Sequence, residues 1–160
     1  VHSERDLGVL SSDALKVSGQ CSQAYLKATR MLGLIKSTIV NKDPDIMVRL
    51  YKTLVRPHVE YCTAAWSPYY QKDKDLIEKI QHRFTKMIPS ISHLSYEERI
   101  EILHLWTLEE RRNRADLIQV FKMYSGASAP SFGDFFEVDS RGRTRGHSLK
   151  LVKHRSSTLV

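Results

Sequence analysis

The stretch from Asp43 to Pro68 constrains the fold more than any other part of this chain. Its apolar residues recur every three to five positions, which predicts one apolar side of a helix about six turns long. Asp43 can cap the start of that helix, Pro44 suits its first turn, and Pro68 ends it. A helix with so much apolar surface is a core element on which other helices pack. The residues of the predicted apolar side are Ile46, Leu50, Leu54, Val59, Cys62 and Trp66.

Pro57 lies in the middle of the same stretch. A proline removes one backbone donor and clashes with the preceding turn, so we expect a bend or a short break near Thr53. The apolar pattern also predicts that Leu54 is buried and that Lys52 is exposed.

Helical periodicity predicts four further helices, over residues 18–39, 72–88, 96–103 and 108–125. Ser95 with Glu98, and Thr107 with Glu110, have capping-box spacing and open the last two of these helices. Gly126 suits the end of the last one. The predicted core residues of the first, second and fourth helices are Cys21, Tyr25, Ala28, Leu32, Ile35, Ile39, Leu76, Ile80, Phe84, Met87, Leu117, Val120, Phe121 and Tyr124.

The run Leu-Gly-Val-Leu at residues 7–10 predicts a short strand, since Val is β-branched and Gly suits a bend. After Gly126 the periodicity stops, and Gly, Ser, Pro and basic residues predominate. We therefore expect an all-α fold, a bundle of about five helices around a central kinked helix. A short N-terminal strand without partners and an irregular basic C-terminal arm complete it. The helical domain is predicted to cover residues 13–126, and the flexible arm residues 127–160.

The composition is that of an ordinary globular domain, with 41% hydrophobic and 27% charged residues. The two cysteines lie inside helical patterns, which argues against a disulfide framework and favours an intracellular setting, nuclear or cytoplasmic. No apolar run reaches the ~20 residues of a membrane span, and no signal peptide opens the chain, so we expect no membrane association. Because the chain begins with Val and ends in SSTLV, we expect a piece of a longer protein.

The net charge of +7 is concentrated at the C-terminal end. Residues 1–140 hold 19 Lys and Arg against 18 Asp and Glu, whereas residues 141–160 hold six basic residues and no acidic one. An extended backbone would project alternate residues to one side about 7 Å apart, near the phosphate spacing of a single strand. We therefore predict a nucleic-acid-binding tail, with a solvated end or a localisation signal as alternatives. Its basic residues are Arg141, Arg143, Arg145, Lys150, Lys153 and Arg155.

Candidate chemical sites are few. His58 and Cys62 have metal-ligand spacing, but a structural zinc site needs four ligands, and Cys21 and His82 supply no second pair. We therefore predict no metal site and no cofactor in this chain. Capping and dipole complementarity explain the paired glutamates at 97–98 and 109–110 without an acid–base role.

No Gly-rich phosphate loop, serine elbow or pair of adjacent aspartates occurs in the sequence, so the chain on its own is not predicted to be an enzyme and has no expected small-molecule substrate. One aromatic set could stack on bases, although a core helix end with a polar rim explains it better. Its members are Tyr61, Trp66, Tyr69 and Tyr70.

Six stretches that together cover nearly the whole chain carry a family resemblance. They are RDLGVLSSDALK, KATRMLGLIKSTI, LYKTLVRPHVEYCTAAWSPYYQKD, LIEKIQHRFTKMIPSI, LSYEERIEILHLWTLEERRNRADLIQVFKMYSG and RTRGHSLKL. In this order they resemble the C-terminal part of the reverse transcriptase of LINE-type non-LTR retrotransposons, in the jockey-like branch. The most specific are LVRPHVEYC and LSYEERIEILHLWTLEERR.

The resemblance implies that the parent protein is an RNA-directed DNA polymerase whose catalytic magnesium site, in the palm, lies upstream of Val1. The chain alone is then expected to be inactive. Residues 1–12 resemble the end of the palm, with Leu7, Gly8 and Val9 as the primer grip, and residues 13–126 resemble the thumb. The role of the RTRGHSLKL segment is not implied.

The partners implied are the RNA or DNA template–primer duplex and the palm and fingers of the same polypeptide. The chain departs from the family pattern at Ser11, Ser12, Ala14 and Gly19. Two alternatives to a nucleic-acid grip are a domesticated protein-interaction module and a non-functional remnant. An apolar edge exposed near residues 7–10 would favour the thumb, because a self-sufficient module should cover it.

Overall fold

The computed structural model describes residues 3–12, 16–139 and 150–152 of the chain. The chain divides into two compact units, residues 1–115 and residues 116–160. The described part is mostly helical, with a two-stranded sheet near its N-terminal end. The predicted helical class is therefore confirmed.

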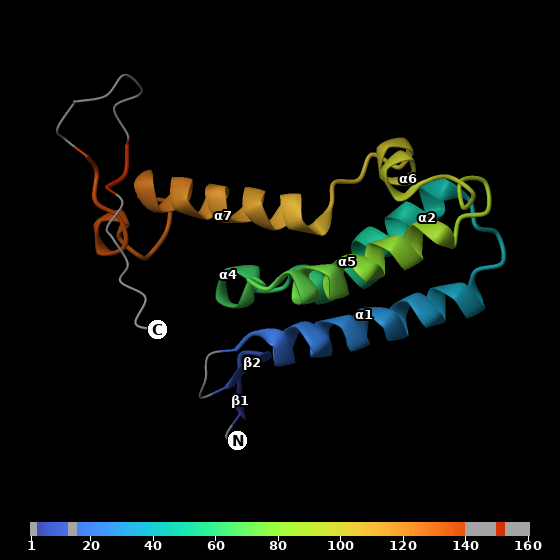
Figure 1. The fold of residues 1–160 in the computed structure, drawn as a ribbon, viewed down its shortest axis with the longest axis horizontal. Coiled ribbons are helices and arrows are strands. Elements are labelled where there is room, and N and C mark those ends of the chain that lie inside the picture. Colours follow the sequence, from blue (N-terminus) through green and yellow to red (C-terminus); the bar gives the residue numbers. More distant parts are fainter. Residues whose placement is uncertain (1–2, 13–15, 140–149, 153–160) are drawn as a thin grey trace. The chain divides into compact units, whose positions relative to one another are not determined.

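Three helical elements form the body of the first unit (Figure 1). The first is α1 (Ser18–Thr38), and the third is α5 (Gln71–Lys86). Between them in sequence runs a helical rod composed of α2 (Pro44–Leu50), the π-helical segment η1 (Tyr51–Val55) and α3 (Arg56–Glu60). The Ser18 hydroxyl at the start of α1 donates a 2.5 Å hydrogen bond to Asp73 in the first turn of α5. The two helices run in the same direction, and residues of their C-terminal halves line one groove (Figure 1).

The α-helical pattern of the rod is interrupted around Thr53, where the sequence predicts a bend or a short break. The π-helical segment ends at Val55, two residues before Pro57, so the proline's missing donor falls where the α-helical hydrogen-bond pattern is already interrupted. Asp43 caps the start as expected, since its side chain accepts from the backbone N–H groups of Asp45 and Ile46.

Two details of the predicted central helix are wrong. The helix ends at Glu60, because Cys62 adopts a left-handed backbone conformation with φ 53°, and Trp66 lies on a separate short helix, α4 (Thr63–Trp66). The buried side is also shifted, since Leu54 is 40% exposed and Ile46 and Cys62 are exposed as well. The buried positions are Met47, Tyr51, Val55, Val59 and Trp66.

The core of the first unit lies between the rod and the two parallel helices. The Tyr51 ring stacks on Phe84 of α5 with centroids 4.2 Å apart, and the Tyr51 hydroxyl donates to the fully buried Gln81 over 2.9 Å. On α5 the buried apolar positions are Ile77, Ile80 and Phe84, so Leu76 and Met87, predicted as core, are only partly buried. Most of the side predicted for α1 is buried, with Tyr25 and Ile39 at its margin.

Both predicted capping boxes are present. Ser95 and Glu98 exchange reciprocal hydrogen bonds at the start of α6 (Tyr96–Ile102). Thr107 and Glu110 do the same at the start of α7 (Leu108–Tyr124). Gly126 ends α7 with φ 72°, as predicted, and the N–H of Ala127 donates to the carbonyl of Lys122 in the manner of a Schellman motif.

The second unit begins within α7. Here the predicted core side is exposed, since Leu117 is 71% accessible and Phe121 and Tyr124 are also exposed. Among the aromatic contacts of this unit, the rings of Tyr124 and Phe132 meet edge to face at the short 3-10 helix η2 (Phe132–Asp134), and Phe136 contacts both Phe132 and Phe135. The periodicity of α7 therefore marks an apolar side that the described residues do not cover.

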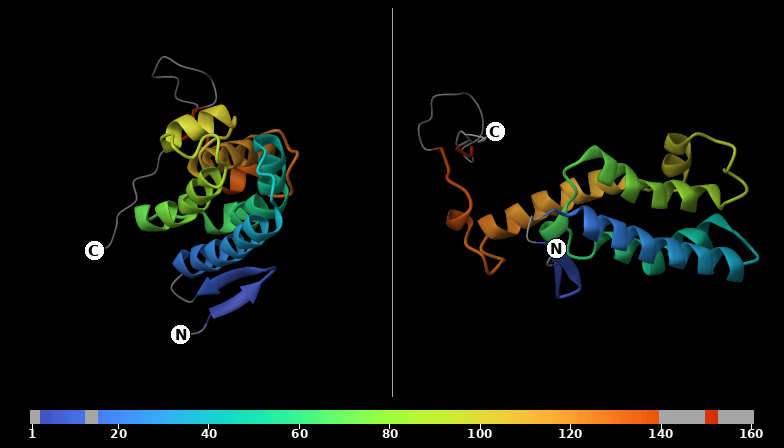
Figure 2. Two further views of the ribbon diagram at one scale, coloured as in Figure 1. Left: turned by 90° about the vertical axis from the view of Figure 1, so that its right-hand side faces the viewer. Right: turned by 60° about the horizontal axis from the view of Figure 1, so that its bottom comes forward.

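A β-hairpin precedes α1 (Figure 2). Its strands β1 (Ser3–Asp6) and β2 (Val9–Ser12) pair in antiparallel fashion, with Asp6 opposite Val9. Leu7 and Gly8 form the two-residue turn, both with positive φ, as a type I′ turn requires. The prediction of an unpaired strand over residues 7–10 is thus wrong. The acidic and basic residues of β1 do not alternate with apolar ones, so the sequence carries no strand pattern there.

No helix in the described part of the chain is long and apolar enough to span a membrane.

Candidate nucleic-acid interface

A groove of about 470 Å³ runs between the C-terminal halves of α1 and α5, and we call it the basic groove. Leu32, Gly33 and Met87 provide its apolar floor, and Thr29 lines one wall. Its four cations, which give it its name, are Lys36, Lys42, Arg83 and Lys86. None of the described residues that line it is acidic.

The local sequence explains why cations gather here. Lys36 lies in the last turn of α1, and Arg83 and Lys86 lie in the last turn of α5. Positive side chains are favourable at helix C-termini, where carbonyl groups carry partial negative charge. Since the two helices are parallel, these separate preferences place the cations on one surface.

The charges of the basic groove remain available for a ligand. Within the described residues no carboxylate pairs with any of the four cations, although Arg83 lies 5.4 Å from the centre of the Tyr25 ring. The buried hydroxyl of Thr29 has no hydrogen-bond partner there. A Cβ at Gly33 would meet nothing within 4 Å, so the floor is open at that point. The groove can therefore accept an anionic surface.

A second, smaller pocket of about 190 Å³ lies next to the segment that joins α6 to α7, and we call it the Trp106 pocket. Trp106 is 49% exposed, and the guanidinium of Arg114 lies over its ring, 4.9 Å from the ring centre. The residues lining the pocket are Lys52, Arg56, Gln81, His104, Leu105, Trp106, Arg111 and Arg114.

One carboxylate neutralises part of the Trp106 pocket. Glu60 accepts both side-chain hydrogen bonds of Arg111 and also lies 3.4 Å from Arg56. The hydrogen bond to Glu60 raises the pKa of Arg111 above its ordinary value, so this guanidinium stays charged. Lys52 and Arg114 form no ion pair with any described residue, which leaves the pocket with a net positive charge.

A buried network fixes the backbone beneath Trp106. The Gln81 amide donates to the Trp106 carbonyl and to the Tyr96 hydroxyl, each over 3.0 Å. The Tyr96 hydroxyl in turn donates to Glu78, which also accepts from the N–H of Leu108. Burial raises the pKa of the Glu78 carboxyl. The segment that carries Trp106 is therefore held in place from below.

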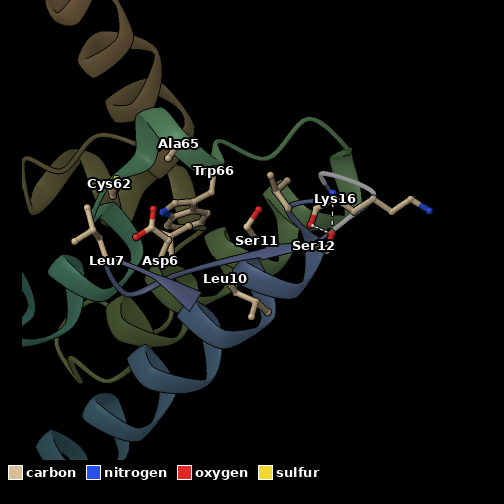
Figure 3. Close-up of a pocket in the computed structure, with 11 residues that line it drawn as sticks. Asp6, Leu7, Leu10, Ser11, Ser12, Lys16, Cys62, Ala65 and Trp66 are labelled. Carbon is tan, nitrogen blue, oxygen red and sulfur yellow. Dashed lines mark hydrogen bonds between the residues drawn. The ribbon is translucent and has the colours of Figure 1, made fainter. Parts of the chain in front are cut away.

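The residues predicted as the primer grip lie at the hairpin. Leu7 and Gly8 are the turn, and Val9 begins β2. A pocket of about 440 Å³ is lined by the hairpin together with Cys62, Ala65 and Trp66 (Figure 3). Leu7 itself is 83% exposed. An apolar edge is thus present near residues 7–10.

The predicted nucleic-acid-binding tail falls mostly outside the described residues. This applies to Arg141, Arg143, Arg145, Lys153 and Arg155. Lys150 is described, and its carbonyl accepts a 2.7 Å hydrogen bond from the N–H of Asp139.

The aromatic set splits in the structure. Trp66 is buried, its indole N–H donates to the Tyr61 carbonyl, and the buried Arg112 guanidinium lies over its ring. The buried Trp66 ring cannot stack on a base. The side chains of Tyr61, Tyr69 and Tyr70, by contrast, are exposed. Across residues 3–12, 16–139 and 150–152 no group of three or more His, Cys, Asp or Glu side chains could hold a metal ion.

Sequence reasoning missed both basic sites. Most of the residues that line the basic groove come from α1 and α5, and no local sequence pattern predicts that these two helices lie side by side. For Trp106 a signal was available, because an aromatic residue followed closely by Arg111, Arg112 and Arg114 is typical of aromatic and basic interleaving. Comparison with known protein families, with curated proteins and with solved structures finds no match for this chain.

Proposed function

We propose that this chain grips nucleic acid without sequence preference, as the thumb of an RNA-directed DNA polymerase whose catalytic palm lies elsewhere in the polypeptide. The observation that carries the proposal is the basic groove, where four cations that pair with no carboxylate of the described residues line an open surface. Cations so placed neutralise phosphates and release counterions, which supplies affinity that is independent of sequence. The exposed apolar edge at Leu7 supports the thumb assignment, since a palm would cover it.

The test is a salt titration of binding to a fluorescent RNA–DNA hybrid duplex. If about four cations contact phosphates, log K should fall against log salt with a slope of roughly −3 to −4. Replacing Lys36 and Lys86 with Ala should flatten that slope by about two. Arg49, an exposed cation of α2 that lines neither site, provides the charge control as Arg49→Ala.

Two substitutions at Gly33 test the charge of the basic groove separately from its shape. Because the Cβ position of this glycine is open, Gly33→Glu adds a carboxylate among the cations without a clash, and Gly33→Gln adds the same volume without charge. Duplex affinity should fall in Gly33→Glu and change little in Gly33→Gln. Equal affinities for the two would remove the groove from the interface.

The basic tail is tested in the same titration. Replacing Arg141, Arg143 and Arg145 together with Ala should flatten the slope by about two to three if the tail contacts phosphates. An unchanged slope would assign the grip to the helical body alone.

The thumb assignment also predicts that the chain alone has no polymerase activity. Primer extension on poly-rA/oligo-dT with magnesium should give no incorporation above background. Chelator-sensitive incorporation would contradict it.

The second candidate is a protein-interaction module. The exposed apolar side of α7, formed by Leu117, Ile118, Phe121 and Tyr124, favours it. Replacing Leu117 and Phe121 with Ser should leave duplex affinity unchanged under the first proposal. The interaction module is the better assignment if duplex binding is weak and neither the groove and tail variants nor the salt concentration changes it.

A further inference from the structure

The Trp106 pocket has two features that the basic groove lacks. Its indole is half exposed, and the guanidinium of Arg114 already lies over that indole. Indole and guanidinium planes are the surfaces on which proteins stack unpaired bases. A base inside a duplex has no free face, because its neighbours cover both sides. The surface formed by Trp106 and Arg114 therefore suits an unpaired base that lies outside a nucleic-acid duplex.

The charge and size of the pocket fit one nucleotide. Lys52 and Arg56 lie along the rod, on the same pocket lining as Trp106. At about 190 Å³ the pocket has less than half the volume of the basic groove, and it is too small for a duplex.

The pocket is also preorganised. The fully buried Gln81 holds the Trp106 carbonyl, and the hydrogen bond from the Leu108 N–H to Glu78 fixes the chain just after it. A ligand that stacks on Trp106 does not have to order this backbone, so less of the binding free energy is lost.

We propose that the Trp106 pocket holds one unpaired nucleotide of a nucleic-acid strand, with its base on the Trp106–Arg114 stack and its phosphate near Lys52 and Arg56. The inference rests on the proposed function only in taking nucleic acid as the ligand. The basic groove binds duplex backbone, and the pocket binds a single strand. No hydrogen-bond readout is involved, so the base is held without sequence preference.

Intrinsic fluorescence tests the proposal directly, because the chain has two tryptophans and Trp66 is only 1% exposed. Adding a single-stranded oligonucleotide should quench the emission of Trp106. The Trp106→Ala variant, which keeps Trp66, should show no quenching. Its affinity for the oligonucleotide should fall roughly 5- to 100-fold, as expected for the loss of one stacked base.

Matched variants separate stacking from folding and from charge. Trp106→Tyr keeps an aromatic face and should retain most of the single-strand affinity, whereas Arg114→Ala should lose part of it. Arg49→Ala controls for the loss of a cation. Affinity for a blunt duplex should change less than twofold in Trp106→Ala, and a thermal melt checks that each variant is folded.

Two results would overturn the proposal. One is an unchanged single-strand affinity in both Trp106→Ala and Arg114→Ala, and the other is a parallel loss of duplex and single-strand affinity. If Gly33→Glu leaves duplex binding intact while Trp106→Ala loses the single strand, the groove assignment fails and the pocket stands. If the opposite pattern appears, the pocket fails and the groove stands.

Discussion

The backbone N–H of Leu108 donates a 2.9 Å hydrogen bond to Oε2 of Glu78 on α5. The other carboxyl oxygen of Glu78 accepts from the Tyr96 hydroxyl. Burial raises the pKa of this carboxyl above its ordinary value, although both hydrogen bonds act in the opposite direction. One side chain thus ties the first turn of α7 and helix α6 to α5, and the stability of that tie depends on pH.

Glu78 predicts a fall in stability as pH rises. Its folded pKa lies above the unfolded value of about 4.3, so between these two values the folded state binds more protons than the unfolded state. The free energy of unfolding should decrease through that window and stay reduced above it. Glu78→Gln removes the titration, so its stability relative to the natural chain should grow from pH 4 to pH 8. Denaturant titrations measure this, with Glu101→Gln on the exposed side of α6 as control. A constant difference would contradict the assignment.

Two adjacent residues of the rod, Leu54 and Val55, predict losses of stability that differ in size. Val55 is fully buried and Leu54 is 40% exposed. Val55→Ala removes buried carbon atoms and leaves a cavity, so it should cost about 2–3 kcal/mol. Leu54→Ala should cost less than about 1 kcal/mol, although leucine is the larger side chain. Denaturant midpoints of the two variants give the comparison. A larger loss in Leu54→Ala would mean that the buried side is assigned wrongly.

The hairpin turn predicts a stabilising substitution. Leu7 has φ 43°, a left-handed conformation that costs an ordinary L-residue roughly 1–2 kcal/mol and that Asn adopts more easily. Its side chain is mostly exposed, so Leu7→Asn should raise the free energy of unfolding by several tenths of a kcal/mol. Gly8→Ala, at φ 88°, should lower it. Thermal unfolding of both variants tests the turn, and shifts of the same sign would argue against it.

The two thiols should differ in reactivity. Burial raises the pKa of Cys21 to about 11, and its side chain lies in the core, whereas Cys62 is exposed. A maleimide at neutral pH should label Cys62 rapidly and Cys21 only as fast as the fold opens. Peptide mapping by mass spectrometry distinguishes them, with Cys62→Ser as control. Equal labelling rates would show that Cys21 is not protected.

Local signals in the sequence predicted local structure well. The capping boxes at Ser95 and Thr107, the glycine end at Gly126 and the interruption of the α-helix before Pro57 all depend on a few neighbouring residues, and all are confirmed. The side of a helix that is buried is harder to predict. Leu54 and Val55 are both apolar, and the π-helical segment that selects Val55 has no sequence pattern of its own.

Long-range features could not be predicted in the same way. The strand Ser3–Asp6 has no apolar alternation and exists because β2 pairs with it. The apolar periodicity of α7 indicated a core side, but periodicity alone cannot say whether a partner covers it. Lys36 and Lys86 meet at the basic groove only because α1 and α5 are parallel.

The π-helical segment Tyr51–Val55 also determines where this chain can change in length. Val59 lies twelve positions after Met47, and both are fully buried. In an uninterrupted α-helix, at about 100° per residue, twelve positions would turn them about 120° apart, whereas eleven would leave them within about 20°. The π-helical segment therefore accommodates one residue more than an α-helix would, and it keeps Met47 and Val59 on the same buried side. A deletion there should restore α-helical periodicity across the segment with the same buried side, whereas a deletion elsewhere in the rod would rotate one half of its core into solvent. Among related chains, a one-residue gap is expected at this segment.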